Sequence, residues 1–438
     1  MVKKQKKIIS GWGRNIKVLC NVLYPNNYKD ISNLEKKDVI ARGLGRSYGD
    51  SAIQPNLTIN MTSLSKINSF SKDTGILSVQ AGVCIEKIIE NFLPLGWILP
   101  VTPGSKFVTV GGMIASDVHG KNHHIDGSIA NFIEELSIII DRDILVCSLE
   151  NNSKLFLDTI GGMGLTGIII EAKIKLLKVS TSYIRQETIP TTNLEETMKV
   201  FKDSLNTKYV VAWIDCFSVG DKLGRSIVFK GEHAELLDID LDSQKNPFSL
   251  KSKSKLSLYF TLPSFFLSNF TIKLFNRYYF FKNRISKRKI LSYDTFFYPL
   301  DFINNWNLMY GKKGFVQYQF VLPEINSSHG IKEILKKINS FNLPPFLTVL
   351  KLMGKKSRGT LSFPLAGYTL ALDFPIRKDT YKLLNTLDKI VLKYEGKIYL
   401  AKDNRVSKDT FQKMYKQEIK QFNRSDNFTS MQSDRIEI

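Results

Sequence analysis

The first 180 residues alternate short apolar runs with glycine turns, a pattern typical of short β-strands. In chain order the runs read DVIARGLG, GILSVQAG, EELSIII, ILVCSLE and LTGIIIEAKIKL. One helical pattern lies among them, over Ile85–Phe92, because its apolar residues recur every three or four positions. Together these patterns predict an α+β domain over residues 1–179.

From about residue 181 glycine becomes rarer and aromatic residues more frequent. The runs VVAWIDCF, GFVQYQFVLP and GYTLALDFPI predict strands, whereas KEILKKINSF and YKLLNTLDKIVLKY predict amphipathic helices. This alternation predicts a second domain over residues 180–394, built on an antiparallel sheet with flanking helices. After Gly396 a further strand, polar turn and helix predict a C-terminal segment over residues 395–438. The expected fold class is therefore α+β with two domains.

The net charge of +21 changes this ordinary picture of a globular chain. Either the composition is generally rich in lysine, or the partner is anionic: phosphate groups, an acidic membrane surface or nucleic acid. The four cysteines are widely spaced, which fits a reducing compartment. The basic N-terminus lacks the apolar core of a signal peptide, and the uncharged stretch Leu256–Ile272 is short and interrupted by Pro263. We therefore expect a cytoplasmic protein.

Residues 243–293 contain no acidic side chain and combine basic with aromatic residues. The basic members are Lys245, Lys251, Lys253, Lys255, Lys273, Arg277, Lys282, Arg284, Lys287, Arg288 and Lys289. Cations and aromatic rings together suit an anionic bilayer surface. The same mixture suits single-stranded nucleic acid, and an aromatic core helix with a solvated basic rim is the plain structural alternative.

Three glycine-rich loops carry the candidate chemistry. The first, Arg42–Asp50, has three glycines after a short strand, so that successive backbone N–H groups can point into one anion-binding concavity. It is not a Walker loop, because no G-K-[ST] follows. The second, Pro103–His124, contains Gly111 and Gly112 at the expected start of a short helix. The third, Gly161–Ile168, precedes a strand and allows close approach by a ligand.

Three of the five histidines, His119, His123 and His124, lie within the second loop. No carboxylate or thiolate stands at a metal-ligand spacing beside them, so we expect no metal site. Capping or packing is an alternative role for His119 and His124, whereas His123 is the better candidate for a residue that lines a cofactor.

The order and spacing of the loops resemble the FAD domain of the vanillyl-alcohol-oxidase/PCMH flavoprotein superfamily, and more narrowly the family of decaprenylphosphoryl-β-D-ribose 2′-oxidases. The matching strings include RGLGRSYGD, PGSKFVTVGGMIASDVHGKNHH, GGMGLTGII, QYQFVLP, LSFPLAGYTLALDFP and YLAKDNR. The resemblance implies a PCMH-type FAD-binding domain. Several relatives link FAD to a histidine of the first loop, where this chain reads Gly45-Arg46-Ser47, so we expect FAD to be bound non-covalently.

The resemblance also implies a set of cofactor-binding residues. They are Arg42, Gly43, Leu44, Gly45, Arg46, Ser47, Tyr48, Pro103, Gly104, Thr109, Gly111, Gly112, Ser116, His119, Gly120, Asn122, His123, Gly162, Gly167, Ile168, Tyr399 and Lys402. Across the flavin, the resemblance places substrate-binding residues at Trp213, Gln317, Gln319, Lys351 and Ala371, with Tyr48, His123, Tyr399 and Lys402 as further candidates. At Ala371 the mycobacterial enzymes carry a cysteine, so the thiol is not needed for the chemistry here.

Lys402 is the strongest catalytic candidate, because a cation beside the flavin stabilises the charge that develops when hydride reaches N5. An ordinary salt bridge to Asp403 or another acid is its structural alternative. His123, Tyr48 or Lys402 could accept the substrate proton, and the sequence leaves the choice open. Gln317 and Gln319 share one face of a strand, which forms either a polar pocket wall or a solvated surface.

The function implied by the resemblance is FAD-dependent oxidation of the C2 hydroxyl of a polyprenyl-phosphate-linked pentose, the first half of a ribose-to-arabinose epimerisation for cell-envelope glycan synthesis. A separate NAD(P)H-dependent short-chain reductase would complete the epimerisation, and residues 243–293 would contact the inner face of the plasma membrane rather than nucleic acid. The nearest alternative is an aldonolactone or alditol oxidase of the same superfamily that acts on a soluble sugar.

Overall fold

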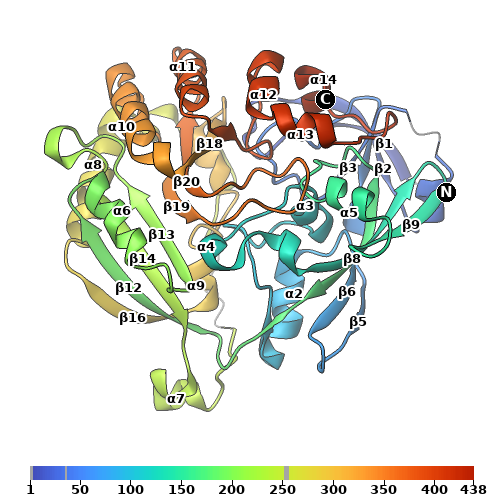
Figure 1. The fold of residues 1–438 in the computed structure, drawn as a ribbon, viewed down its shortest axis with the longest axis horizontal. Coiled ribbons are helices and arrows are strands. Elements are labelled where there is room, and N and C mark those ends of the chain that lie inside the picture. Colours follow the sequence, from blue (N-terminus) through green and yellow to red (C-terminus); the bar gives the residue numbers. More distant parts are fainter. Residues whose placement is uncertain (1–2, 35–36, 251–255) are drawn as a thin grey trace.

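The computed structural model describes residues 3–34, 37–250 and 256–438. Sheets from the first 180 residues form one side of the molecule, and a larger sheet with its helices forms the other side (Figure 1). Helices thus accompany mainly antiparallel sheets, which confirms the predicted α+β class. The basic residues Lys251, Lys253 and Lys255 lie outside the described residues.

Two sheets carry the glycine loops. The four-stranded sheet has the order β1-β2-β4-β3, with β1 Lys3–Ile9, β2 Val18–Tyr24, β4 Leu57–Asn60 and β3 Val39–Arg42. The five-stranded sheet has the order β5-β6-β10-β8-β9, with β5 Ile67–Phe70, β6 Ile76–Gln80, β10 Ile168–Lys175, β8 Ile133–Ile140 and β9 Asp143–Cys147. The predicted helix is α2, Ile85–Phe92, and its stripe of buried isoleucines and Phe92 packs into the core beneath the second sheet. The three loops follow β3, precede or contain α3 (Val110–Ala115), and precede β10.

The second half is an eight-stranded antiparallel sheet. Its order is β16 Lys287–Ser292, β12 Tyr183–Thr191, β14 Ser226–His233, β13 Tyr209–Ile214, β19 Thr348–Met353, β20 Gly367–Pro375, β18 Phe315–Pro323 and β21 Lys397–Ile398. The predicted strands in VVAWIDCF, GFVQYQFVLP and GYTLALDFPI are β13, β18 and β20. Short pairs β7 Trp97–Ile98 with β11 Leu177–Lys178, and β15 Leu256–Ser257 with β17 Ile303–Asn304, complete the strands described.

Helices cover one face of this large sheet. They are α6 Leu194–Lys202, α10 Glu324–Phe341 and α11 Thr380–Lys393 (Figure 1). Alternate strand residues such as Leu350, Leu370 and Leu372 are fully buried against them. The side chains between those positions face the other way, toward the glycine loops, because successive side chains of a strand point to opposite faces. The predicted helices over residues 332–341 and 381–394 are α10 and α11, and α10 begins earlier than the sequence pattern indicated.

The C-terminal segment returns to the first half. It contains α12 Lys408–Met414, α13 Lys416–Gln421 and α14 Met431–Ile436, which lie along one edge of the molecule (Figure 1). Arg435 of α14 binds Asp50 at 3.0 Å and Asp403 at 2.9 Å, so one guanidinium holds the end of the first glycine loop to the turn after β21. The turn after β21, which Arg435 holds through Asp403, carries Lys402.

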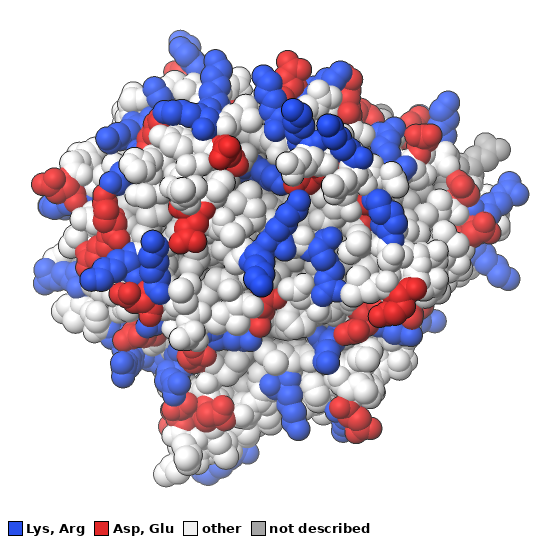
Figure 2. Space-filling model, viewed as in Figure 1, with Lys and Arg blue, Asp and Glu red and all other residues white. Residues whose placement is uncertain are grey.

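Residues 256–293 form an outlying structure on the large sheet. The 3₁₀ turn η6 Ser264–Leu267 and helix α8 Asn269–Lys282 are followed by β16 and by α9 Tyr293–Phe297. Only Ile272 and Asn276 of α8 are buried, so its aromatic side chains do not form a core. Within the described ranges no helix is long and apolar enough to cross a membrane. Lys and Arg gather over α10 to α13 and are mixed with Asp and Glu elsewhere on the face in Figure 2.

Other short helices include α1 Lys29–Ser32, α4 His123–Asp126, α5 Ser153–Thr159, α7 Leu241–Gln244 and the 3₁₀ turn η7 Trp306–Tyr310.

Candidate active site

One cavity lies where all three glycine loops meet the large sheet and the turn after β21. The sequence-predicted residues that line it are Arg42, Gly43, Leu44, Gly45, Arg46, Ser47, Pro103, Gly104, Thr109, Gly111, Gly112, Ser116, His119, Gly167, Gln319, Lys351, Tyr399 and Lys402. The predicted residues outside its lining are Tyr48, Gly120, Asn122, His123, Gly162, Ile168, Trp213, Gln317 and Ala371. Segments separated by up to 360 residues therefore contribute to one site.

The first glycine loop presents its backbone to the cavity. The N–H groups of residues 44–47 have no hydrogen-bond partner within the described part of the chain. Gly45 has a φ of +67°, and a Cβ there would overlap the guanidinium of Arg42, which is itself held by the carbonyls of Ser10 and Ala52. A Cβ on Gly43 would overlap the hydroxyl of Thr109. Only glycine allows the first two loops to approach this closely.

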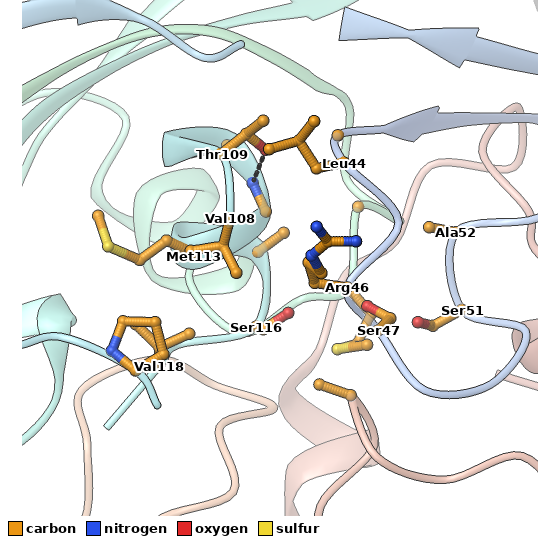
Figure 3. A pocket seen from close by; sticks show the side chains of 18 of the residues that line it. Leu44, Arg46, Ser47, Ser51, Ala52, Val108, Thr109, Met113, Ser116 and Val118 are labelled. Atoms are coloured by element: carbon orange, nitrogen blue, oxygen red, sulfur yellow. Dashed lines mark hydrogen bonds between the residues drawn. The ribbon is translucent and has the colours of Figure 1, made fainter. Parts of the chain in front are cut away.

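Arg46 adds a charge to these backbone donors. Its guanidinium points into the cavity beside Ser47 (Figure 3). It lies 4.0 Å from the ring centroid of Trp12, so that stacking on an aromatic face fixes its position. An arginine held by a ring rather than by a carboxylate keeps its N–H groups available to an anion.

The second loop forms helix α3 and then turns away from the cavity. The hydroxyl of Thr109 accepts a hydrogen bond from Gly112 N–H at 3.3 Å, which caps the helix (Figure 3). Ser116 and His119 still line the cavity. Asn122 is buried elsewhere, because its amide donates to the carbonyl of Pro100 at 2.8 Å and to Asp126 at 2.5 Å. Its structural role is therefore to fix the loop.

The third loop contributes mainly backbone and methionine surface. Met163, Gly164 and Gly167 line the cavity. Gly162 packs against the carbonyl of Asp158, and Ile168 is fully buried beside Ile139. The apolar lining residues, among them Met61, Met113 and Met163, were not singled out from the sequence, because an apolar side chain gives no chemical signal there.

His119 faces the cavity from between two elements. The amide of Gln319 donates to its Nε2 at 3.0 Å and also to Thr369 at 3.1 Å. With these assigned orientations the proton of the neutral ring stands on Nδ1, which is buried and without a partner among the described residues. Burial, together with the charges of Lys351 and Lys402, lowers the pKa of His119 well below its usual value. His119 is therefore a neutral ring in the cavity lining whose Nδ1–H has no partner among the described residues.

His123 is in a different situation. Its Nδ1 accepts a hydrogen bond from Gly354 N–H at 3.0 Å, so the neutral ring carries its proton on Nε2. Burial lowers its pKa to about 3, with a further contribution from Lys351. Nδ1 is thus engaged and Nε2 carries the proton without a partner among the described residues, so the ring has no free lone pair to accept a substrate proton in this arrangement.

Two half-buried lysines, Lys351 and Lys402, line the cavity without a carboxylate ion pair within the described residues. Lys402 lies 4.0 Å above the ring of Tyr48, and the charge of Asp373 opposes the burial that lowers its pKa. Burial, with a contribution from Lys402, lowers the pKa of Lys351 to about 7. The alternative salt bridge from Lys402 to Asp403 does not form, because Asp403 binds Arg435. Two buried ammonium groups of this kind favour an anionic ligand.

Asp373 is the residue that sequence reasoning missed. It accepts hydrogen bonds from Gln317 at 2.5 Å and from Tyr310 at 3.3 Å. Burial raises its pKa, whereas Gln317 and then Lys402 lower it. Its place directly opposite Gln317 in the β18–β20 register was the available signal.

The three other substrate-binding candidates share a face of the sheet with the lining residues. Ala371 lies directly opposite Gln319, and Val349 opposite both Ala371 and Trp213. Gln317 lies two pairs along from Gln319 and therefore on the same face. The resemblance and the sheet register therefore point to the same surface.

The donors in this cavity fit FAD. Free backbone N–H groups and Arg46 match a pyrophosphate, since glycine-rich loops bind phosphate through their backbone. The unpartnered Nδ1–H of His119 and the ammonium of Lys402 match the polar edge of a flavin ring. Bound FAD supplies the hydride acceptor.

Comparison with known proteins agrees with this geometry. Residues 28–146 match the family model of an FAD binding domain. The chain is 35% identical over 421 residues to the decaprenylphosphoryl-β-D-ribose oxidase of Mycolicibacterium smegmatis, which covers 93% of this chain and 91% of that protein. It is 28% identical over 346 residues to an uncharacterised protein of Streptomyces coelicolor, covering 76% and 92%. A putative D-arabinono-1,4-lactone oxidase of Neurospora crassa is 27% identical over 141 residues, covering 32% and 25%.

Proposed function

The chain belongs to the vanillyl-alcohol-oxidase/PCMH superfamily of FAD-dependent oxidoreductases, in the family of the Mycolicibacterium oxidase, and from this premise we propose that it oxidises a polyprenyl-phosphate-linked pentose. The reacting group is the C2 hydroxyl of the sugar. The observation that carries the proposal is the pair of buried ammonium groups, Lys351 and Lys402, on the sheet side of a cavity whose other side holds the FAD loops. A neutral free sugar would leave one of these charges without a partner.

Lys402 and Lys351 have separate roles in this proposal. Lys402 lies at the reacting centre and binds the hydroxyl of the substrate. It contacts the ring of Tyr48, and the charge of Asp373 raises its pKa. Lys351 lies on β19 and binds the phosphate of the substrate. Because burial lowers the pKa of Lys402, its neutral form is accessible, and it can accept the proton that leaves the hydroxyl. The negative charge of Asp373 raises the pKa of Lys402 and so limits how much of the neutral form is present.

FAD is held without a covalent bond in this proposal. Arg46 stands in the first loop where several relatives carry a linking histidine. His119 is the one histidine in the cavity lining, and its Nε2 is engaged by Gln319. Precipitation with acid should therefore release all of the flavin into the supernatant. Flavin fluorescence that stays with the denatured polypeptide would contradict this part of the proposal.

Membrane contact is the second part of the proposal. Exposed apolar side chains, three of them aromatic, follow one side of α8, at Phe270, Leu274, Tyr278 and Phe281, with exposed fractions of 56–74%. Lys282 and Arg284 follow directly, and aromatic rings beside cations suit an anionic bilayer at the inner face of the plasma membrane. A lipid-linked substrate resides in a membrane, so an enzyme that acts on it needs a surface that contacts the membrane.

A partner is the third part. Reduction of the keto sugar needs a nicotinamide, and a separate NAD(P)H-dependent short-chain reductase would supply it to complete the epimerisation. A mixture of this chain, such a reductase and NADH should convert the ribosyl substrate to its arabinosyl epimer. This chain alone should stop at the keto sugar.

The deciding experiment is anaerobic mixing of the purified yellow protein with a polyprenyl-phosphoryl ribose while the flavin absorbance is followed. The wild type should bleach. Lys402→Ala should keep its yellow colour and bleach about 100-fold or more slowly, because the group that accepts the hydroxyl proton is lost. Lys413→Ala, an exposed lysine of the same C-terminal segment, is the matched control and should bleach normally.

The alternative, a soluble-sugar oxidase, gives the opposite pattern in the same apparatus. Free aldonolactones or alditols would then bleach the flavin, and air would restore the colour with peroxide formation. Bleaching by free sugars but not by the polyprenyl-phosphoryl sugar would overturn the proposed substrate.

A further inference from the structure

A row of directly paired residues crosses the large sheet from the cavity outward. Gln319 of β18, which binds His119, pairs with Ala371 of β20. Ala371 pairs with Val349 of β19, and Val349 pairs with Trp213 of β13. All four side chains project from the same face, because directly opposed residues in antiparallel strands share a face. The row begins in the cavity lining on β18 and ends three strands away on β13.

The outer part of this row is only partly buried. Ala371, Val349 and Trp213 are each half-buried, whereas their neighbours Leu350, Leu370 and Ala212 on the helix side are fully buried. The row is also almost entirely apolar beyond Gln319. An apolar, partly open track that starts at a reaction cavity is a surface for an apolar part of the substrate.

Helix α8 closes the far end of the row. The ring of Trp213 meets Tyr279 with centroids 4.9 Å apart, and Asn276 of the same helix donates to Asp215 at 3.0 Å. Tyr279 therefore faces the sheet, while Phe270, Tyr278 and Phe281 on other sides of the helix are exposed. The apolar track on the sheet thus continues into the aromatic surface of α8.

The charge distribution fixes the direction in which a substrate would lie. Lys351 stands two residues along β19 from Val349 and belongs to the cavity lining. A phosphate at Lys351 leaves the sugar in the cavity and directs a tail on that phosphate along Val349 toward Trp213. The polar and apolar parts of the surface therefore have the order of a sugar, a phosphate and a hydrocarbon.

We propose that Ala371, Val349 and Trp213, with Tyr279 at the end, bind the first isoprene units of the substrate tail before the tail reaches the membrane. This inference rests on the proposed function and assigns a site for a part of that substrate. Three steps between neighbouring strands span about 14 Å, the extended length of roughly three isoprene units. The protein-held part of the tail should therefore end at about that length.

The test measures kcat/KM for phosphoryl-riboses whose tails carry one, two, three or five isoprene units, in buffer without vesicles or detergent. In the wild type kcat/KM should rise by at least about tenfold from one to three units, because each unit buries apolar surface, and then level off. In Ala371→Leu, which obstructs the track, and in Trp213→Ala, which removes its end, the ratio between three units and one unit should fall below about threefold. The ratio compares two substrates on the same protein, so it is independent of general losses of activity.

Leu241→Ala is the matched control, since Leu241 is an exposed apolar residue of α7 remote from the row, and its ratio should equal that of the wild type. Flavin absorbance and the unfolding temperature verify that each variant is folded. A wild-type ratio near one, or a ratio unchanged in both track variants, would overturn the tail site while the proposed oxidation stands. Failure to oxidise any of the tailed riboses would instead refute the proposed function itself.

Discussion

The two sides of the cavity are built in different ways. The cofactor side consists of glycine loops that offer backbone N–H groups, and its close packing excludes even a methyl group at Gly43. The substrate side consists of single side chains from β18, β19, β20 and the turn after β21, brought together by strand register. A site that binds its ligand through the backbone retains binding when side chains are replaced, but not when the course of the backbone changes. A site that binds through single side chains is less sensitive to the backbone, but each charged side chain contributes individually.

The largest expected effect tests the cofactor side by adding a single methyl group. Gly43→Ala places a Cβ onto the hydroxyl of Thr109, so the first two loops must separate. We expect the affinity for FAD to fall by about 100-fold, as overpacking of a close contact does, and the purified protein to be pale. A titration of the apoprotein with FAD, followed by flavin fluorescence, measures this.

Gly104→Ala is the control for that prediction. Gly104 lines the same cavity, but a Cβ there meets nothing within 4 Å. Its FAD affinity should stay within about threefold of the wild type. Equal losses in both variants would mean that the loops do not need their close approach.

The cofactor side was also the part of the site that could be predicted from the sequence. Glycine spacing is a local signal, since the loops are continuous stretches whose backbone binds the ligand, and most of the predicted loop residues line the cavity. The strands and helices with clear periodicity, such as α2 and β18, were likewise predictable. Tertiary structure changed the roles of residues within the loops: Asn122 and His123 are as polar as His119, and only the fold directs them elsewhere.

The substrate side was less predictable for a physical reason. Asp373 receives hydrogen bonds from Gln317, 56 residues away, and from Tyr310, 63 residues away. Nothing near Asp373 in the sequence marks it, because its importance comes from the pairing of β18 with β20. The exposure of the aromatic residues of α8 was equally hidden, since the sequence fits a buried and an exposed aromatic helix alike.

The second prediction removes Arg435, which joins the end of the first glycine loop to the turn that carries Lys402. Arg435→Ala leaves Asp50 and Asp403 buried without their shared guanidinium. We expect the free energy of unfolding to fall by about 2 kcal/mol, less than for a fully buried network because Arg435 is partly exposed. Denaturant unfolding measures this. Arg424→Ala, at an exposed arginine of the same segment, should change stability by less than about 0.5 kcal/mol.

The third prediction changes one charge on the substrate side and leaves the loops intact. Asp373→Asn keeps the shape of the side chain, and its amide oxygen can still accept the hydrogen bond from Gln317, but the negative charge that raises the pKa of Lys402 is removed. The pKa of Lys402 should fall, so the acidic limb of the pH profile of kcat, where the neutral amine is lost, should move to lower pH, and the plateau of kcat should fall about tenfold because the amine becomes a weaker base. FAD affinity should not change. An unshifted pH profile with a lower kcat would assign Asp373 a purely structural role.

The smallest effect concerns Lys351 and separates the two buried cations. Burial lowers its pKa to about 7, so the ammonium is present below that pH and is lost as the pH rises through it. If the ammonium binds the phosphate of the substrate, KM should rise about three- to fivefold between pH 6 and pH 8, as a partly screened ionic contact is lost. In Lys351→Arg, whose charge does not titrate in this range, KM should be nearly constant with pH. In Lys351→Gln it should be high and constant. A pH dependence that persists in the arginine variant would place the titrating group elsewhere, and Lys402 would then have to bind both the phosphate and the reacting hydroxyl.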